Sequence, residues 1–323
     1  MDVSVIIVNY NTFLLTCNCI RSVKEKTLGL AYEIILVDNA SADRNPDDFL
    51  KEFPDITLVK SPDNCGFAKG NNLGIARSTG NYVLLLNSDT ELVNNAIHLA
   101  WERMKADPNI GVLSSKLIFP DGRLQYPASR TLSLKYELRE LLRMNRNLTK
   151  EQKADLYLSN LFNHEEEKEA DWVWGAFFMM PRIVLNRFPE VVPGQTEAKL
   201  PDKFFMYVED IMWCWYIKKL GYKVLYYPDA VVIHYIGGSS KGAKAAGVEK
   251  DDSGLAEAEK RIKGMMKLLP NQFKFLTQTR GRAYAISFFA TRAMLLYSIR
   301  TPDTKAQATA YVKALKMMAF AKA

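Results

Sequence analysis

The chain has 323 residues, of which 48% are hydrophobic and 24% are charged. This composition is typical of a globular protein and excludes intrinsic disorder, a collagen-like chain and a disulfide scaffold. The net charge of +7 is unevenly distributed, because residues 260–323 contain 13 Lys and Arg but one acid. The preceding residues carry a small excess of acids, which is not the pattern of a uniformly basic nucleic-acid-binding protein.

The first ninety residues alternate between short β-branched segments and segments with the apolar spacing of helices. The predicted elements are strands at Ser4–Val8, Glu33–Val37, Ile56–Lys60 and Tyr82–Leu86, and helices at Phe13–Val23 and Phe67–Arg77. This alternation predicts right-handed βαβ units. We therefore expect an α/β fold of the Rossmann-like kind, with a mostly parallel sheet flanked by helices.

Polar side chains follow each of these four strands. They are Asn9–Asn11, Asp38–Ser41, the pair Asp63 and Asn64, and Asn87–Asp89. Any single cluster is more typical of a turn or a helix N-cap than of a site. Because the carboxyl ends of parallel strands meet at one edge of a sheet, four clusters together predict a ligand-binding site there.

The rest of the chain is less regular. Helices are predicted at Glu91–Ala106, within Leu132–Asn163 and at Glu209–Leu220, and strands at Trp172–Met180, Lys223–Tyr227 and Ala230–His234. From about residue 255 onward the pattern predicts basic amphipathic helices. The longest nearly apolar stretch has 17 residues around Arg292, so no transmembrane helix is expected. The acidic N-terminus does not fit a secretory signal.

The segment Gly66–Gly74 has glycines at every fourth position. This spacing matches neither the dinucleotide-binding fingerprint nor the P-loop. Gly70 and Gly74 lie on one helix face and fit close packing of the helix on the sheet. Alternatively, Lys69 and the neighbouring asparagines fit the binding of a nucleotide or its phosphates near a helix N-terminus.

Three further motifs carry candidate chemistry. Asp89 follows a buried strand, where a carboxylate binds a divalent cation that bridges a diphosphate; the alternative is a turn that caps the next helix. Glu209 and Asp210 begin a predicted helix, where they either favour the helix dipole or supply an ionised general base. His234 ends a strand before a glycine-rich loop at 237–240, a position where histidine is more often structural than a ligand.

Taken in chain order, these motifs resemble the inverting glycosyltransferases of family 2, most closely their bacterial rhamnosyltransferase-like branch. The resemblance covers roughly residues 1–240 and is carried by Val5–Asn11, Val37–Ser41, Asn64–Asn72, Leu86–Thr90, Pro120–Gln125, Trp174–Ala176, Glu209–Asp210 and Val232–His234. It implies the GT-A fold and transfer of a sugar from a nucleotide diphosphate sugar, with dTDP-rhamnose suggested by the branch. The implied acceptor is a saccharide or a polyprenyl-diphosphate-linked saccharide in the synthesis of cell-surface polysaccharide.

The resemblance also implies roles for individual residues. Asp210, paired with Glu209, matches the catalytic base, while Asp89 and His234 match the ligands of a divalent cation, Mg²⁺ or Mn²⁺. Trp174 and Gly175 would line the acceptor side. The implied nucleotide-binding residues are Tyr10, Asn11, Asp38, Asn39, Asn64, Lys69, Asn87 and Ser88.

The predicted organisation is a catalytic domain at residues 1–254, with a nucleotide-sugar part at about 1–115 and an acceptor part at about 116–254, followed by a basic helical region at 255–323. In that region Arg280, Arg282, Arg292 and Arg300 alternate with Phe288, Phe289, Leu295, Leu296 and Tyr297. This pattern suits helices that lie in an anionic membrane surface; a cap on the catalytic domain is the alternative. The expected location is cytoplasmic, peripheral on the inner face of the cell membrane, with no nucleic-acid partner.

Two positions depart from the family pattern. Asn87 stands where relatives have the first acid of a DxD motif, and Met212 and Tyr216 replace an acid and an arginine after the base. A catalytically degenerate module that assembles at a membrane is therefore an alternative function. A sugar nucleotidyltransferase is another, although Asn9–Thr12 lacks the basic Gly-rich loop expected after its first strand. A dehydrogenase is disfavoured because GxGxxG is missing.

Overall fold

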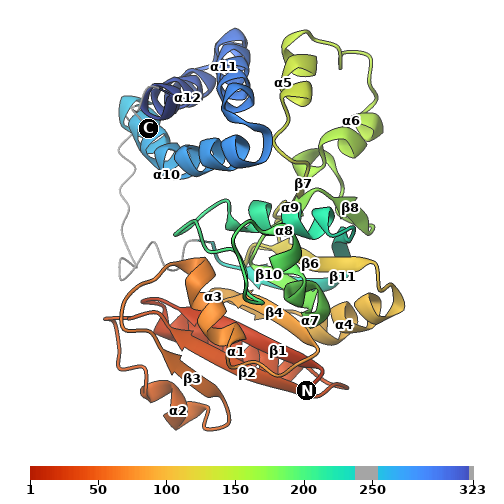
Figure 1. Ribbon diagram of the computed structural model, residues 1–323, viewed down its shortest axis with the longest axis vertical. Helices are drawn as coiled ribbons and strands as arrows, with labels where there is room; N and C mark the ends of the chain where they lie inside the picture. The colour runs from red at the N-terminus through yellow and green to blue at the C-terminus, as the bar shows by residue number, and fades with distance from the viewer. Residues whose placement is uncertain (237–253, 320–323) are drawn as a thin grey trace. The chain divides into compact units, whose positions relative to one another are not determined.

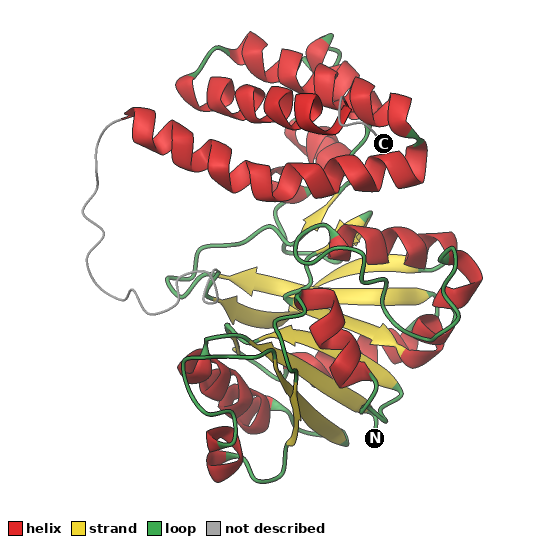
Figure 2. Ribbon diagram, turned by 60° about the vertical axis from the view of Figure 1, so that its left-hand side comes forward, coloured by secondary structure: helices red, strands yellow, loops and turns green. Residues whose placement is uncertain are grey.

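The computed structural model describes residues 1–236 and 254–319, and these form two compact units. The sheet unit comprises residues 1–130 and 154–236, and the helical unit comprises residues 131–153 and 254–319. Figure 1 labels the elements of both units, and Figure 2 distinguishes the strands of the sheet unit from the all-helical second unit. Each unit has its own buried core.

A nine-stranded sheet forms the centre of the sheet unit (Figure 2), in the order β3-β2-β1-β4-β10-β6-β11-β5, with β8 paired to β11. Its strands are β1 (Val3–Asn9), β2 (Tyr32–Asp38), β3 (Thr57–Lys60), β4 (Tyr82–Asn87), β5 (Thr90–Leu92), β6 (Ile110–Ile118), β8 (Lys168–Ala170), β10 (Phe177–Pro181) and β11 (Lys223–His234). Strands β1 to β4 are parallel, as are β6 and β11, whereas β5, β8 and β10 are antiparallel to their neighbours. The predicted mostly parallel α/β sheet is confirmed.

The register of the first strands sets the position of the polar clusters. Asn9, at the end of β1, is opposite Asp38 at the end of β2, and the preceding Val8 is opposite Asn87 of β4. The four predicted strands are all present, to within about one residue at each end. Their carboxyl ends therefore place the polar clusters of β1, β2 and β4 at one edge of the sheet.

Alternate residues of β1 face opposite sides of the sheet. Val5 and Ile7 belong to the core that includes α1 (Phe13–Lys26) and α4 (Ala96–Ala106). On the other side, Gly74 of α3 (Phe67–Ile75) approaches β1 so closely that an added Cβ would lie 2.5 Å from Ile6 Cγ2. The glycine spacing of α3 thus serves close helix–sheet packing.

The second half of the sheet differs from the predicted elements. The expected helix at Glu91–Ala106 is wrong at its start, because Glu91 pairs with Ile233 in the antiparallel contact of β5 and β11. The two strands expected around Pro228 form one strand, β11, with an irregularity in its pairing to β6. The expected strand at Trp172–Met180 is interrupted at 174–176, between β9 (Trp172–Val173) and β10.

The remaining elements surround this sheet. A two-stranded sheet pairs β7 (Ala128–Ser129) with β9 (Trp172–Val173). The other helices that begin in or border the sheet unit are α2 (Asp48–Glu52), α6 (Lys150–Tyr157), the 3-10 helix η1 (Ser159–Leu161), α7 (Arg182–Asn186), α8 (Phe188–Val191) and α9 (Glu209–Lys219). Trp213 of α9 stacks against Phe67 and makes an edge contact with Phe178, which fixes α9 beside α3.

The helical unit consists of α5 (Leu134–Leu141), α10 (Gly254–Arg280), α11 (Arg282–Ile299) and α12 (Pro302–Ala319). Its core contains aromatic rings in edge contact, with Phe289 5.3 Å from Phe273 and 5.1 Å from Tyr311 between ring centroids. Small buried alanines along α12 let this helix approach its neighbours closely. No helix among the described residues is both long and apolar enough to cross a bilayer.

Two expectations for the C-terminal helices are corrected by this packing. Phe288, Phe289, Leu295 and Leu296 are buried inside the unit rather than presented to a membrane. Arg292 is half-buried and pairs with Glu137 of α5 at 3.0 Å between Nη1 and Oε2. Residues 131–153, which the sequence analysis assigned to the acceptor part, join the helical unit because this ion pair and α5–α11 packing bind them there.

Candidate active site

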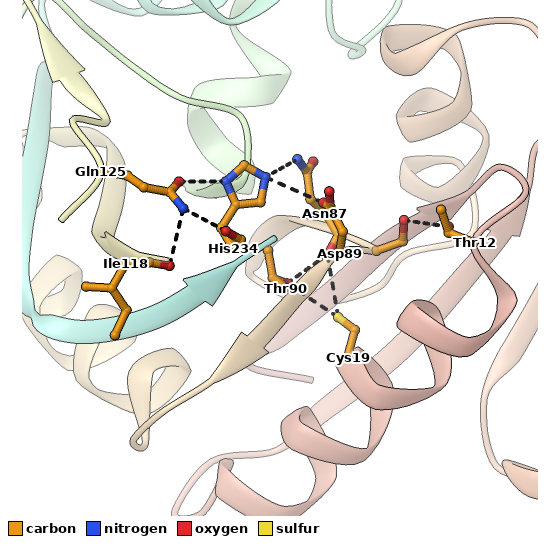
Figure 3. A network of polar contacts seen from close by, with 9 residues as sticks. Thr12, Cys19, Asn87, Asp89, Thr90, Ile118, Gln125 and His234 are labelled. Atoms are coloured by element: carbon orange, nitrogen blue, oxygen red, sulfur yellow. Dashed lines mark hydrogen bonds and ion pairs between the residues drawn. The ribbon is translucent and has the colours of Figure 1, made fainter. Parts of the chain in front are cut away.

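The ring of His234 lies between Gln125 on one side and Asn87 and Asp89 on the other (Figure 3). His234 Nδ1 is 2.9 Å from Gln125 Oε1, while the Gln125 amide nitrogen donates to the carbonyl oxygens of His234 and Ile118. Since Gln125 Oε1 only accepts hydrogen bonds, Nδ1 carries the proton of the neutral ring. Nε2 lies 3.5 Å from Asp89 Oδ1 and 3.4 Å from Asn87 Nδ2, and in that tautomer it presents its lone pair to them.

Strand pairing explains why these residues meet. β5 and β11 are antiparallel with His234 opposite Thr90, and the Tyr235 N–H donates to the Asp89 carbonyl at 2.9 Å. The residues after Asp89 thus form a strand, which excludes the alternative that Asp89 caps a helix. Asp89 and His234 are both buried, at 6% and 7% exposure respectively. A carboxylate and an imidazole lone pair held together in this way suit a divalent cation.

A second network joins the ends of β1, β2 and β4. Asn9 donates from Nδ2 to Asp38 Oδ1 and to Ser41 Oγ, each at 2.9 Å. Its Oδ1 accepts from Thr12 Oγ1, which lies 3.0 Å from the hydroxyl of Ser88. This buried network holds Asp38 and the residue before Asp89 in one arrangement. Asn9, which is not among the predicted nucleotide-binding residues, lies at the centre of this network.

Asn11 and Asn39 stabilise the loops that follow β1 and β2. Asn11 Oδ1 accepts from the Ala42 N–H at 2.7 Å, and its own N–H donates to Ser41 Oγ. Asn39 donates from Nδ2 to Asn64 Oδ1 at 3.0 Å and accepts the Cys65 N–H at 3.1 Å. The side-chain amides of Asn11 and Asn39 thus form hydrogen bonds within the protein. Their role towards a nucleotide would be to hold the loops in shape rather than to bind it directly. Tyr10 follows β1 and is half-buried.

The loop before α9 contacts the start of α3. The carbonyl of Phe205 accepts the Phe67 N–H at 2.9 Å, and a Cβ at Gly66 would lie 2.3 Å from that carbonyl. Gly66, with φ of 83°, therefore has both a conformational and a steric requirement for glycine. This contact brings the exposed ring of Phe205 beside the Asn64–Gly66 segment. The sequence offered no signal for it.

The residues Trp174–Ala176 lie between the predicted cation ligands and the predicted base. The Trp174 ring makes an edge contact with His234, at 6.4 Å between centroids. The Gly175 N–H donates to Asp210 Oδ2 at 3.4 Å, and the Ala176 carbonyl accepts the Asn87 N–H at 3.0 Å. Three consecutive residues thus contact Asn87, His234 and Asp210. The predicted motifs at Asn87, His234 and Asp210 therefore lie close together in the structure.

Glu209 and Asp210 are adjacent acids at the N-terminus of α9, where Glu209 is buried and Asp210 is half-buried. Burial raises the pKa of Glu209, the charge of Asp210 raises it further, and Glu209 Oε2 has no partner among the described atoms. Burial also raises the pKa of Asp210, opposed by the N–H groups of Ile211 and Gly175 that its carboxylate accepts. Backbone N–H groups oppose this rise at both acids, but only at Glu209 does the charge of its neighbour add to burial, so a proton shared by the pair resides on Glu209.

The backbone before the two acids is strained. Tyr207 and Val208 have φ of 71° and 77°, in the left-handed region that β-branched residues rarely adopt. Such conformations persist where surrounding contacts impose them, and they cluster at functional sites. Here they turn the chain from Phe205 into α9, so that Asp210 meets Gly175.

Lys69 stands apart from the other predicted nucleotide-binding residues. It is exposed on α3 and lines a cavity of about 460 Å³ together with Cys65, Asn72 and the segment at 197–202. Across residues 1–236 and 254–319, no three His, Cys, Asp or Glu side chains gather as a metal cluster. Asp89 and His234, the two predicted cation ligands, thus have no third such side chain beside them among the described residues.

Comparisons with known proteins agree with this geometry. The family model described as "Glycosyl transferase family 2" matches residues 4–165. A stretch of 112 residues is 31% identical to poly-beta-1,6-N-acetyl-D-glucosamine synthase of Staphylococcus aureus, covering 32% of this chain and 27% of that protein. Another, of 117 residues, is 26% identical to the uncharacterised protein y4gI of Sinorhizobium fredii and covers 34% of this chain and 13% of that one. The matched region thus spans about a quarter or less of each relative.

Among solved structures, the chain is similar to the mannosyltransferase PcManGT from Pyrobaculum calidifontis, determined in complex with GDP-Man and Mn²⁺. The TM-score is 0.53 with 17% identity, and the alignment covers 99% of this chain and 88% of the mannosyltransferase. At this identity the similarity concerns the fold. The predicted GT-A architecture is confirmed.

Proposed function

Since the chain belongs to glycosyl transferase family 2, we propose that it transfers a sugar from a nucleotide diphosphate sugar to an acceptor hydroxyl with inversion at the anomeric carbon. The observation that carries this proposal is the contact of Trp174–Ala176 with both His234 and Asp210. Through this contact, a candidate cation ligand and the candidate base both lie next to one short stretch of backbone. A single displacement at one carbon needs these groups close together.

The donor side is built by Asp89, His234 and Asn87. The residues fit a divalent cation, because the Nε2 lone pair of His234 faces Asp89 while Gln125 fixes the ring from its other nitrogen. Mg²⁺ and Mn²⁺ take oxygen ligands and commonly complete their shell with phosphate and water. Such a cation, when bound, neutralises the negative charge of the departing diphosphate. Asn87 adds a neutral amide where relatives have an acid, which leaves two protein ligands.

The acceptor side is built by Asp210, Gly175 and Trp174. The acceptor oxygen attacks the anomeric carbon as the bond from that carbon to the diphosphate oxygen breaks, and the bonding electrons leave with the nucleoside diphosphate. Asp210 takes the acceptor proton, which it is able to do because the shared proton of the acid pair resides on Glu209. The Gly175 N–H orients the carboxylate. The exposed ring of Phe205, beside Gly66, offers a stacking surface to a sugar.

For the finer substrate and location, we retain what the sequence suggests. The donor would be dTDP-rhamnose and the acceptor a saccharide or polyprenyl-diphosphate-linked saccharide of a cell-surface polysaccharide. The helical unit supports a lipid-linked acceptor, because residues 131–153 and 254–319 hold 18 Lys and Arg against 6 acids. This charge suits peripheral association with an anionic cytoplasmic membrane face.

The direct test is turnover. The full chain is incubated with Mn²⁺ and each of a panel of nucleotide sugars, with and without short saccharide or polyprenyl-diphosphate acceptors, and the release of nucleoside diphosphate is measured. We expect one donor to be consumed, fastest with acceptor, and NMR of the product to show an inverted anomeric configuration. Nucleotide binding without consumption of any donor would favour the degenerate module, for which Asn87 is the specific motivation.

A further inference from the structure

Although Phe288, Phe289, Leu295 and Leu296 are buried, other large apolar side chains of the helical unit are exposed, and four of them lie at the carboxyl ends of α5 and α11. Leu142 and Met144, just after α5, are 66% and 58% exposed, and Tyr297 and Ile299, at the end of α11, are 48% and 53% exposed. Isolated exposed apolar residues are common, but a group of four on neighbouring helix ends is a candidate contact surface.

These residues come together because α5 and α11 pack side by side. The Leu134 N–H donates to the Tyr284 hydroxyl near the starts of both helices, and Glu137 pairs with Arg292 further along. Both helices therefore run in the same direction, and Figure 1 shows their carboxyl ends at the same end of the helical unit, at the top of the view. We call this surface the α5–α11 edge; it comprises Leu142, Arg143, Met144, Arg146, Tyr297, Ile299 and Arg300.

The turn after α5 is held by its own hydrogen bonds. Asn145 is buried, donates to Glu140 Oε1 at 2.6 Å and accepts from Arg139 Nε at 3.1 Å. The Met144 N–H donates to the Arg139 carbonyl at 2.9 Å. Because the polar Asn145 occupies the inside of the turn, Leu142 and Met144 are directed outwards. Their exposure is thus imposed by the fold of the turn.

Positive charge surrounds the apolar side chains. Arg143, Arg146 and Arg300 are exposed and form no ion pair with another described residue. The nearest acids along α5 are engaged elsewhere, with Glu140 bonded to Asn145 and Glu137 paired with Arg292. Aliphatic and tyrosine side chains flanked by arginines match the interface of an anionic bilayer, where the apolar parts enter the acyl boundary and the guanidinium groups reach phosphates.

We propose that the α5–α11 edge is the surface by which the protein docks on an anionic membrane. The inference rests on the membrane association proposed above but needs no glycosyl transfer. The proposed membrane contact is a compact edge that combines residues 297–300 with residues 142–146, and the latter lie outside the basic helices at 260–323. The buried apolar face of α11 packs against protein and takes no part in the contact.

Vesicle flotation with the full chain tests this assignment. Vesicles of phosphatidylcholine with about one third phosphatidylglycerol are compared with phosphatidylcholine alone, at low and high salt. We expect binding to the anionic vesicles that weakens with salt. Arg143→Gln with Arg146→Gln should lower the partition coefficient roughly 10- to 30-fold at low salt. Leu142→Glu with Met144→Glu should abolish binding.

The control is Met317→Glu, which places a new glutamate at an exposed methionine of α12 outside the edge and is matched to the single variant Met144→Glu. Thermal unfolding and nucleotide binding of all variants should equal those of the wild type. Wild-type binding that the edge variants retain, or that Met317→Glu removes equally, would refute the edge while leaving membrane association intact. Absence of wild-type binding refutes both. Self-association that the edge variants abolish would instead identify an interface between copies and overturn the proposal.

Discussion

Both units of the protein bury acidic side chains, but they treat them differently. In the helical unit, Glu137 is largely buried and packs against Arg292, whose guanidinium lies 3.0 Å from its carboxylate. In the sheet unit, neither Glu209 nor Asp210 forms an ion pair with a described residue, and one oxygen of Glu209 has no partner. A buried acid that is paired with a basic side chain contributes to the stability of the fold. A buried acid without a basic partner lowers stability, and such acids are typical of sites where a proton is transferred.

The largest effect, on turnover, is expected from the acid pair Glu209 and Asp210, which has no basic partner among the described residues. Asp210→Asn removes the proton acceptor while keeping the shape and the Gly175 contact. Turnover should fall by about 10²–10⁴-fold, the usual contribution of a positioned base, with nucleotide affinity nearly unchanged. Steady-state kinetics with nucleotide titration checks this. Asp121→Asn, at an exposed acid in the turn after β6, is the control and should remain active. A variant at Asp210 with near wild-type turnover would refute the base assignment.

On the paired side, Arg292→Met should destabilise the helical unit. It leaves Glu137 buried without its cation, and the free energy of unfolding should fall by about 1–3 kcal/mol. Denaturant unfolding measures the change. Adding Glu137→Gln to Arg292→Met removes the uncompensated charge and should restore part of the loss. If Arg292→Met alone were neutral, the pair would not be a structural element.

Gln125 offers a way to disturb the site without touching a ligand. Gln125→Leu removes the acceptor that fixes His234 Nδ1, and it should weaken Mn²⁺-dependent nucleotide binding about 10- to 100-fold. Isothermal titration calorimetry is the measurement. Gln152→Leu, in the exposed start of α6, is the matched control. Equal affinities for the two variants would mean that His234 needs no orientation from Gln125.

The smallest effect concerns stability and pH at Glu209. Burial raises the pKa of Glu209 in the folded protein, so the stability that its neutral form provides is present below the unfolded pKa and is lost as pH rises through the folded value. Glu209→Gln removes this loss. Its melting temperature should therefore exceed that of the wild type at pH 8 and approach it at pH 5. A difference independent of pH would indicate that Glu209 is ionised throughout.

The sequence predicted those features that depend on local pattern. β-Branched runs predicted β1 to β4, and the polar residues after β1, β2 and β4 lie at one edge of the sheet as expected. It missed what depends on pairing between distant segments. Glu91 has a helix-compatible sequence, yet its pairing with Ile233 makes it a strand residue and brings His234 beside Asp89. The hydrogen bond from Phe67 to Phe205 likewise joins segments almost 140 residues apart.

The C-terminal helices show the same limit. Apolar periodicity identifies a helix face that must be kept from water, but it does not show whether protein or lipid covers that face. Phe288 and Phe289 are covered by protein, and Arg292, expected at a membrane, pairs with Glu137. The acceptor of Arg292 lies 155 residues away, beyond any local pattern.

Coupling between a cation and a nucleoside diphosphate tests the central claim most directly. Affinities of the nucleoside diphosphates are measured by calorimetry with and without Mn²⁺, for the wild type, Asp89→Ala and Asp210→Asn. We expect Mn²⁺ to strengthen binding of one nucleotide in the wild type and in Asp210→Asn, and to have no effect in Asp89→Ala. Nucleotide binding that is indifferent to Mn²⁺ and unchanged by Asp89→Ala would contradict the account.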